Sequence, residues 1–168
     1  IISYLTTMTR EGFAYRVDTR LRPTGAKGPL VQSVVAFRNY FSSGAETWER
    51  QSLVNSRFVA GDGHVGRAFS ETLQGLIYRD HDPVALAADI RSMRKRMQEE
   101  RGKEDASQYN IKQGMGGLVD IEFLAQYLQL RHGRGHRRLR VPGTINALRA
   151  LRKQRVLSAD DHRFLCDS

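Results

Sequence analysis

Hydrophobic and polar residues alternate along residues 13–22. The charged residues fill one set of alternate positions, and the other set holds Phe13, Tyr15, Val17, Thr19 and Leu21. Because successive side chains of a β-strand point to opposite faces, this pattern predicts a strand with one apolar and one charged face. Residues 23–29 are rich in Gly and Pro and predict a turn, after which residues 30–35 predict a short antiparallel strand.

From residue 36 onwards, apolar residues recur at the three- and four-residue spacing of amphipathic helices. Asp82 followed by Pro83 is typical of a helix start, and Lys95 and Glu99 stand at the spacing of a helical ion pair. The helix from 118 to 130 is apolar on most sides, which predicts a central position. Further helices are predicted over residues 1–9, 36–40, 46–59, 65–78, from 83 onwards, 144–154 and 159–165.

These elements predict an α+β chain that is mostly α. Two short antiparallel strands fall in residues 1–61, and an α-helical domain follows in residues 62–168. The boundary between them is placed at the helix-breaking sequence Gly61-Asp62-Gly63.

Composition narrows the class of protein. Hydrophobic residues make up 40% and charged residues 27%, as in ordinary soluble domains. No apolar run approaches the ~20 residues that span a bilayer, and no secretory signal precedes the first helix. The single cysteine, Cys166, excludes an internal disulfide and makes a reducing cytoplasm the simplest location. The net charge of +9 indicates an anionic partner: a nucleotide, a nucleic acid or an acidic protein surface.

The charged face of the first predicted strand is a candidate phosphate site. Asp18 lies between Arg16 and Arg20, with Arg22 one step further, and side chains two apart on a strand are ~7 Å apart. A carboxylate suits Mg²⁺, and arginines bind phosphate oxygens. Lys27 follows in a Gly-rich turn that would let a phosphate approach the backbone. Patterned charge more often marks a solvated face with Arg–Asp pairing, and the residues alone do not decide between the two.

A second candidate is the glycine-rich segment that begins at Lys112 and leads into a helix. Gly116 and Gly117 at a helix start would leave N–H groups free for an anion, although the same sequence fits a flexible cap. Asp120 and Glu122 point ~200° apart on that helix. Asp120 fits compensation of the helix dipole, whereas Glu122 heads a polar stripe that geometry favours as part of a site.

Two further sequence features carry less chemistry. Trp48 is predicted to be a core residue rather than a platform for a nucleotide base. The five histidines show no zinc-binding spacing.

Three segments resemble the glutamine synthetase adenylyltransferases. Residues 16–25, R-V-D-T-R-L-R-P-T-G, are similar to that family's V-D-x-R-L-R-P-S-G. Residues 46–51 and 57–62 resemble its W-E-x-Q-A-L-x-x-A-R-x-V-A-G-D, and residues 111–123 resemble its I-K-x-G-x-G-G-L-x-D-I-E-F. The three occur in the family's order.

The resemblance implies an activity and a fold. The family has two nucleotidyltransferase halves of the polymerase-β type: one attaches AMP from ATP to a tyrosine of glutamine synthetase, and the other removes it by phosphorolysis. The resemblance therefore implies that residues 1–61 are the C-terminal part of such a domain. Asp120-Ile121-Glu122 favours the adenylylating half. The implied partners are glutamine synthetase and, for the full-length enzyme, a PII-type signalling protein.

The resemblance also assigns roles to residues. Asp18 matches the family's third metal-binding carboxylate and is the expected catalytic and Mg²⁺-binding residue. The first two, in a D-x-D, would lie upstream, so the fragment alone is expected to be inactive. The nucleotide and phosphate contacts expected from the two candidate sites are Arg16, Arg20, Arg22, Lys27, Lys112, Gly116, Gly117 and Glu122.

Two other classes of function are compared with the sequence pattern: nucleic-acid binding and protein binding without catalysis. A nucleic-acid-binding module fits the charge, but aromatic residues are few and do not alternate with the basic clusters. A helical module that binds glutamine synthetase or a signalling protein without chemistry of its own remains the alternative.

Overall fold

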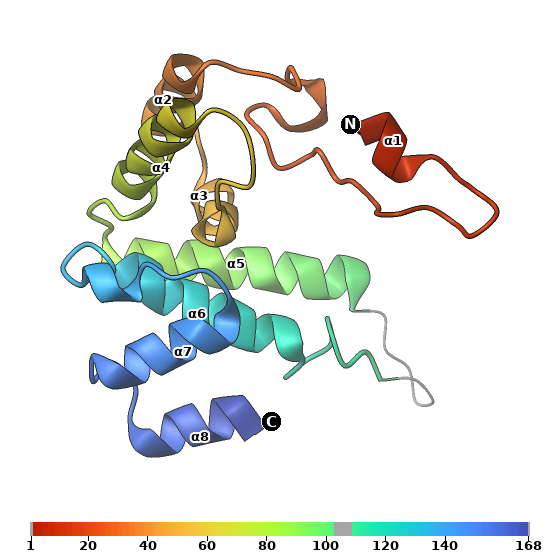
Figure 1. The fold of residues 1–168 in the computed structure, drawn as a ribbon. Coiled ribbons are helices and arrows are strands. Elements are labelled where there is room, and N and C mark those ends of the chain that lie inside the picture. Colours follow the sequence, from red (N-terminus) through yellow and green to blue (C-terminus); the bar gives the residue numbers. More distant parts are fainter. Residues whose placement is uncertain (1, 103–108, 168) are drawn as a thin grey trace.

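A computed structural model of the chain describes residues 2–102 and 109–167. All regular secondary structure in these two ranges is helical (Figure 1). The α-helices are α1 Ile2–Thr6, α2 Val34–Ser43, α3 Thr47–Ser52, α4 Gly63–Ile77, α5 Pro83–Arg101, α6 Leu118–His132, α7 Thr144–Lys153 and α8 Ala159–Asp167. Three short 3₁₀ helices are η1 Gly25–Lys27, η2 Leu53–Asn55 and η3 Arg137–Leu139.

The α+β prediction is wrong, because residues 13–22 form no strand. The β-type pairing within the described residues is one isolated bridge between Thr9 and Gly12. A strand needs a neighbouring strand to bond its N–H and C=O groups, and here Tyr15 N donates only to Leu5 O, at 3.0 Å. The Arg20 backbone N–H donates to the Asp18 carboxylate at 2.9 Å, so a local side chain takes the place of a neighbouring strand there. A strand-containing part of a polymerase-β-like domain is therefore not seen in the described part of residues 1–61.

The predicted strand over residues 30–35 is wrong for a different reason. Ser33 is the N-cap of α2, and its hydroxyl accepts from Ala36 N at 3.1 Å. This cap starts the helix at Val34, so two β-branched residues that suggested a strand become the first helical turn.

The predicted start of α5 is confirmed, and a side chain caps it. The Asp82 carboxylate accepts from Ala85 N, with Pro83 as the first helical residue of α5. Helix α4 begins at Gly63, two residues before its predicted start, because the Asp62 carboxylate accepts from His64 N and Val65 N. The predicted Lys95–Glu99 pair is present at 3.9 Å on the exposed face of α5.

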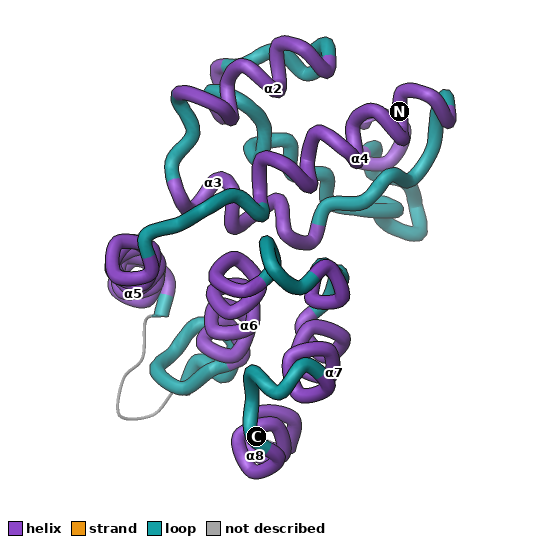
Figure 2. The backbone as a smooth tube through the Cα atoms, turned by 90° about the vertical axis from the view of Figure 1, so that its left-hand side faces the viewer, coloured by secondary structure: helices purple, strands orange, loops and turns teal. Residues whose placement is uncertain are grey.

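Helix α6 lies between α5 and α7 (Figure 2) and contributes residues to two hydrophobic cores. The first joins α2, η2, α4, α5 and α6 through Phe41, Leu53, Val54, Leu73, Ile77, Tyr78, Leu86, Ile90 and Leu130. The second joins α6 to η3 and α7 through Ala125, Leu139, Ala147, Leu148, Leu151 and Leu157. Helix α6 is thus central, as its pattern predicted. The first core contains residues from both sides of residue 61, where the sequence analysis placed the domain boundary. The division into residues 1–61 and 62–168 stays a prediction.

Arg50 is a buried cation that ties α3 to the end of α2. Its side chain is 4% exposed, and its guanidinium donates to Phe41 O at 2.7 Å and to Ala45 O. Burial lowers the pKa of Arg50.

No helix among residues 2–102 and 109–167 combines the length and apolar character needed to cross a membrane.

His81 should make the fold less stable in mild acid. Burial lowers the pKa of His81, outweighing the contact between its Nε2 and Ile77 O at 3.2 Å. Since the unfolded chain binds the proton more tightly, stability is complete above ~pH 6.5 and falls as the pH drops below it. The midpoint temperature of thermal unfolding should be lower at pH 5.5 than at pH 7.5. This difference between the two midpoints should be smaller in His81→Gln than in the unaltered chain. An unchanged difference, equal to that of the exposed control His64→Gln, would contradict this role.

Candidate functional site

A cleft of about 690 Å³ opens between residues 18–21 and helices α3, α5 and α6. It gathers residues from parts of the chain that are far apart in sequence. Its lining consists of Asp18, Arg20, Leu21, Trp48, Gln51, Ser52, Asn55, Met93, Met97, Arg101, Lys112, Gln113, Val119, Glu122, Phe123 and Gln126. Charged groups and apolar side chains thus share one cavity, as in sites that hold a charged ligand with an apolar part.

Asp18 and Arg20 form a closed ion pair at one end of the cleft. Asp18 Oδ1 accepts from Arg20 N and Nε, both at 2.9 Å, and Oδ2 accepts from Arg20 Nη2 at 2.6 Å. These hydrogen bonds from the Arg20 side chain and backbone lower the pKa of Asp18 to about 2. The carboxylate is therefore charged at physiological pH, and a metal ion or phosphate must compete with this pairing.

The other predicted cations of the N-terminal segment do not line the cleft. Arg22 donates to Gly28 O at 3.1 Å, to Ala26 O at 3.2 Å and to Thr19 O, so its guanidinium holds the turn together. The Arg16 guanidinium lies 5.5 Å from the centre of the Phe13 ring. Lys27 is exposed in η1. Of the four predicted arginines and lysines here, the structure brings Arg20 to the cleft.

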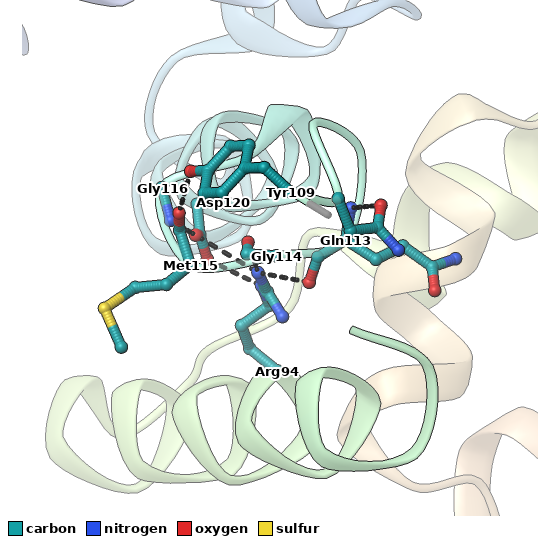
Figure 3. A network of polar contacts seen from close by, with 8 residues as sticks. Arg94, Tyr109, Gln113, Gly114, Met115, Gly116 and Asp120 are labelled. Carbon is teal, nitrogen blue, oxygen red and sulfur yellow. Dashed lines mark hydrogen bonds and ion pairs between the residues drawn. The ribbon is translucent and has the colours of Figure 1, made fainter. Parts of the chain in front are cut away.

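Arg94 fixes the glycine-rich loop against α5 (Figure 3). Its Nε donates to Asp120 Oδ1 at 2.6 Å, and its Nη2 donates to Asp120 Oδ2 at 3.1 Å and to Gly114 O at 2.7 Å. The Arg94 side chain is 9% exposed and that of Asp120 is 37% exposed. Asp120 is therefore tied to α5 rather than free to act on a ligand.

The backbone N–H groups at the start of α6 are bonded within the loop. Gly116, at φ +72°, donates to Asp120 Oδ2 at 2.7 Å, and Gly117 donates to Gly114 O at 3.1 Å. Leu118 and Val119 donate to the carbonyls of residues 111 and 112, both at 3.0 Å. A Cβ on Gly117 would lie 2.6 Å from Ile111 O, so the chain folds back tightly here. The expected open anion site at Gly116 and Gly117 is not formed in this structure, whereas Lys112 lines the cleft.

A chain of amides crosses the cleft wall from α6 to α3. Gln126 Nε2 donates to Glu122 Oε1 at 3.0 Å, and Gln51 Nε2 donates to Gln126 Oε1 at 2.8 Å. An ionised carboxylate only accepts hydrogen bonds, so Glu122 sets the orientation of both amides. This leaves Gln51 Oε1 buried, without a hydrogen-bond partner in the structure as described. A buried acceptor of this kind costs about 1–3 kcal/mol until a donor reaches it.

The rest of the cleft is an apolar wall with one more cation. Trp48, predicted as core, is half-buried here, and its Nε1 donates to Glu46 Oε2 at 3.0 Å. Met93 and Met97, which the α5 pattern indicated only as a packing stripe, line the same wall, and Arg101 stands at the end of α5. Sequence reasoning missed Gln51, Met93, Met97 and Arg101 as site residues. Only Gln51 carried a signal, because it lies in the second resembling segment.

The N-terminal part of the chain, residues 1–72, matches the family model described as glutamate-ammonia ligase adenylyltransferase. Proteins named bifunctional glutamine synthetase adenylyltransferase/adenylyl-removing enzyme are similar along the whole chain. Those of Nitrosococcus oceani and Thioalkalivibrio sulfidiphilus are 38% and 41% identical, each over 100% of this chain. The chain belongs to the glutamine synthetase adenylyltransferase family. It spans about 17% of the length of each of these two relatives.

The C-terminal half of this adenylyltransferase-family chain has a second similarity. Residues 85–168 match the family model described as GlnD PII-uridylyltransferase. This stretch covers α5 to α8, including the Arg94–Asp120 pair and the Lys112 and Glu122 side of the cleft. The sequence patterns did not point to this second family.

Within the adenylyltransferase-family chain, carboxylates that could hold a metal are few. No group of three or more His, Cys, Asp or Glu side chains is arranged to hold a metal ion in residues 2–102 and 109–167. The cleft itself contains Asp18 and Glu122. A hard cation there would find one or two carboxylates, which matches how Mg²⁺ binds when nucleotide phosphates and water supply its other ligands.

Proposed function

We propose that the chain is part of a nucleotidyltransferase that transfers AMP from ATP to a tyrosine of glutamine synthetase, or removes it by phosphorolysis. One observation carries this proposal. The three segments that resemble the family each send side chains into the same cleft: Asp18 and Arg20 from the first, Trp48 and Gln51 from the second, and Lys112 and Glu122 from the third.

The chemistry of the cleft suits a nucleoside triphosphate. Lys112, Arg20 and Arg101 would neutralise the phosphate chain, while Trp48, Met93 and Met97 would pack against the base. Gln51 Oε1 offers an acceptor to a base amino group or a ribose hydroxyl. In the forward reaction the tyrosine oxygen attacks the α-phosphorus of ATP in line and pyrophosphate leaves. In the removal reaction a phosphate oxygen attacks the phosphorus of the AMP group, the bond to the tyrosine oxygen breaks, and ADP and the free tyrosine are formed.

Asp18 would supply a carboxylate to Mg²⁺ once the nucleotide displaces Arg20. The metal neutralises charge on the phosphates when it is bound. Asp18 and Glu122 are the only carboxylates among the described residues that line the cleft, and the 168-residue chain is expected to bind nucleotide but not to turn it over. We assign it to the adenylylating half on the Asp120-Ile121-Glu122 sequence. Regulation by a PII-type signalling protein and a cytoplasmic location follow from the same proposal.

Lys112→Gln should weaken binding of Mg²⁺–ATP to the chain by about tenfold, the scale of one lost charge-assisted contact to phosphate. Isothermal titration is the measurement, and Lys95→Gln, on the exposed face of α5, is the matched control. Equal affinities in both variants would contradict the nucleotide cleft. No binding by the folded, unaltered chain would favour a helical module that binds glutamine synthetase without chemistry of its own.

A further inference from the structure

The positive charge of the chain is concentrated in one short stretch. Residues 131–155 contain nine arginines and lysines and no aspartate or glutamate. The chain as a whole has 27 Lys and Arg against 18 Asp and Glu, a net charge of +9. The remaining residues are thus balanced, and the whole net charge lies between the end of α6 and the end of α7.

Three of these cations hold the structure together. Arg134 pairs with Asp80, and Arg131 donates to the Tyr127 hydroxyl at 3.0 Å. Arg140 donates to Gly133 O at 2.8 Å and lies 4.9 Å from the centre of the Tyr78 ring. The other six are exposed and make no side-chain hydrogen bond or ion pair with the described residues: Arg137, Arg138, Arg149, Arg152, Lys153 and Arg155.

Three of the six line a groove of about 700 Å³ between η3 and α7. Arg149 and Lys153 are one turn apart on α7, and Arg138 faces them from η3. No acidic side chain of the described residues lines the groove; its other lining residues are Val141, Pro142, Asn146, Ala150 and Gln154. Three arginine and lysine side chains thus converge on a site with apolar and amide surface between them.

The groove rests on a rigid support. The opposite face of α7 is buried through Leu148 and Leu151, both 0% exposed, and Leu139 of η3 is also 0% exposed. The loop before α7 is anchored, since Gly143 N donates to Asn55 Oδ1 at 2.9 Å. The backbone positions that carry the cations are therefore held at fixed spacing, which lowers the entropy cost of binding a partner.

We propose that this groove docks a carboxylate-rich surface of the protein substrate. The inference rests on the proposed function for the identity of that substrate, glutamine synthetase. Arginine forks match carboxylates, and an apolar floor suits side chains of a protein. Among the residues of 2–102 and 109–167, none that lines the groove is aromatic, so no platform for a nucleic-acid base is present there. The described linings of the groove and the cleft have no residue in common, so a docked protein and a bound nucleotide would not compete for the same side chains.

The test compares two triple variants that each lose three positive charges. The first is Arg138→Gln/Arg149→Gln/Lys153→Gln in the groove. The matched control is Arg57→Gln/Arg91→Gln/Arg96→Gln, at exposed positions outside it. Binding of the chain to glutamine synthetase, without nucleotide, is measured by biolayer interferometry at moderate salt. The groove variant should bind at least about tenfold more weakly than the control, because three exposed ion pairs are lost together.

Three results would overturn the proposal. These are equal losses in both variants, no binding of glutamine synthetase by the unaltered chain, or a groove-dependent binding of duplex RNA that exceeds that of glutamine synthetase. Titration of Mg²⁺–ATP separates this proposal from the nucleotide cleft. The groove variant should keep its ATP affinity, whereas Lys112→Gln should keep its affinity for glutamine synthetase.

Discussion

Asp18→Asn should abolish AMP transfer in a full-length enzyme that carries this sequence, with a loss on the order of 10³-fold or more. The substitution removes the charge that would hold Mg²⁺ at the triphosphate while keeping the size of the side chain. The carboxylate pairs with Arg20, and both side chains are more than half exposed at 53% and 67%. Removing an exposed pair leaves the core untouched, so the midpoint of thermal unfolding should shift by less than about 2 °C.

The measurement is the rate of AMP incorporation into glutamine synthetase at saturating ATP. Asp160→Asn is the matched control, because Asp160 is an exposed acid on α8 far from the cleft lining. Turnover by Asp18→Asn within a few-fold of the unaltered enzyme would remove Asp18 from the reaction. The same loss in the control would show that the assay reports general damage.

Of the substitutions proposed for this chain, Arg94→Met should lower the free energy of unfolding the most, by about 2–3 kcal/mol. Breaking a buried ion pair leaves an uncompensated charge, and the partial exposure of Asp120 places the cost at the lower end of the usual range. The variant also leaves Gln113 O and Gly114 O without their donor. Urea unfolding of the chain is the measurement, and Arg91→Met, one turn away on the exposed face of α5, is the control.

A double-mutant cycle with Asp120→Asn isolates the pair itself. If Arg94 and Asp120 act together, the two losses should be clearly less than additive. Fully additive losses would show that Arg94 stabilises the loop through its carbonyl contacts alone. A loss below about 0.5 kcal/mol for Arg94→Met would contradict the structural role of the network.

The sequence predicted the helices better than the site. Local sequence signals sufficed to predict the start of α5, because Asp82 and Pro83 mark it. They also sufficed to predict the central position of α6, because apolar residues occupy most sides of that helix. The alternation at residues 13–22 led to a wrong prediction, since a strand also requires a neighbouring strand, and here the Arg20 backbone N–H bonds to the Asp18 side chain instead. Asp18, Arg20, Lys112 and Glu122 do meet in one cleft. The spacing of hydrophobic residues along the sequence does not indicate that these four residues come together, because their proximity depends on how α3, α5 and α6 pack.

The missed features depend on long-range contacts. The Gln51–Gln126 hydrogen bond joins residues 75 positions apart, and the Arg94–Asp120 pair joins residues 26 apart. Asp120 looked like an acid that compensates a helix dipole, and only the packing of α5 against α6 identifies its true partner. Glycines at 116 and 117 suggested open N–H groups, but the folded loop supplies acceptors for them.

The central position of α6 couples the two hydrophobic cores to the cleft. Leu130 belongs to one core, Ala125 to the other, and Gln126 and Glu122 face the cleft. Unravelling α6 would therefore open both cores and the cleft in one event. We expect amide hydrogens of α6 to exchange with solvent only through global unfolding. Any ligand that occupies the cleft should then slow exchange in α7, a helix that it does not touch.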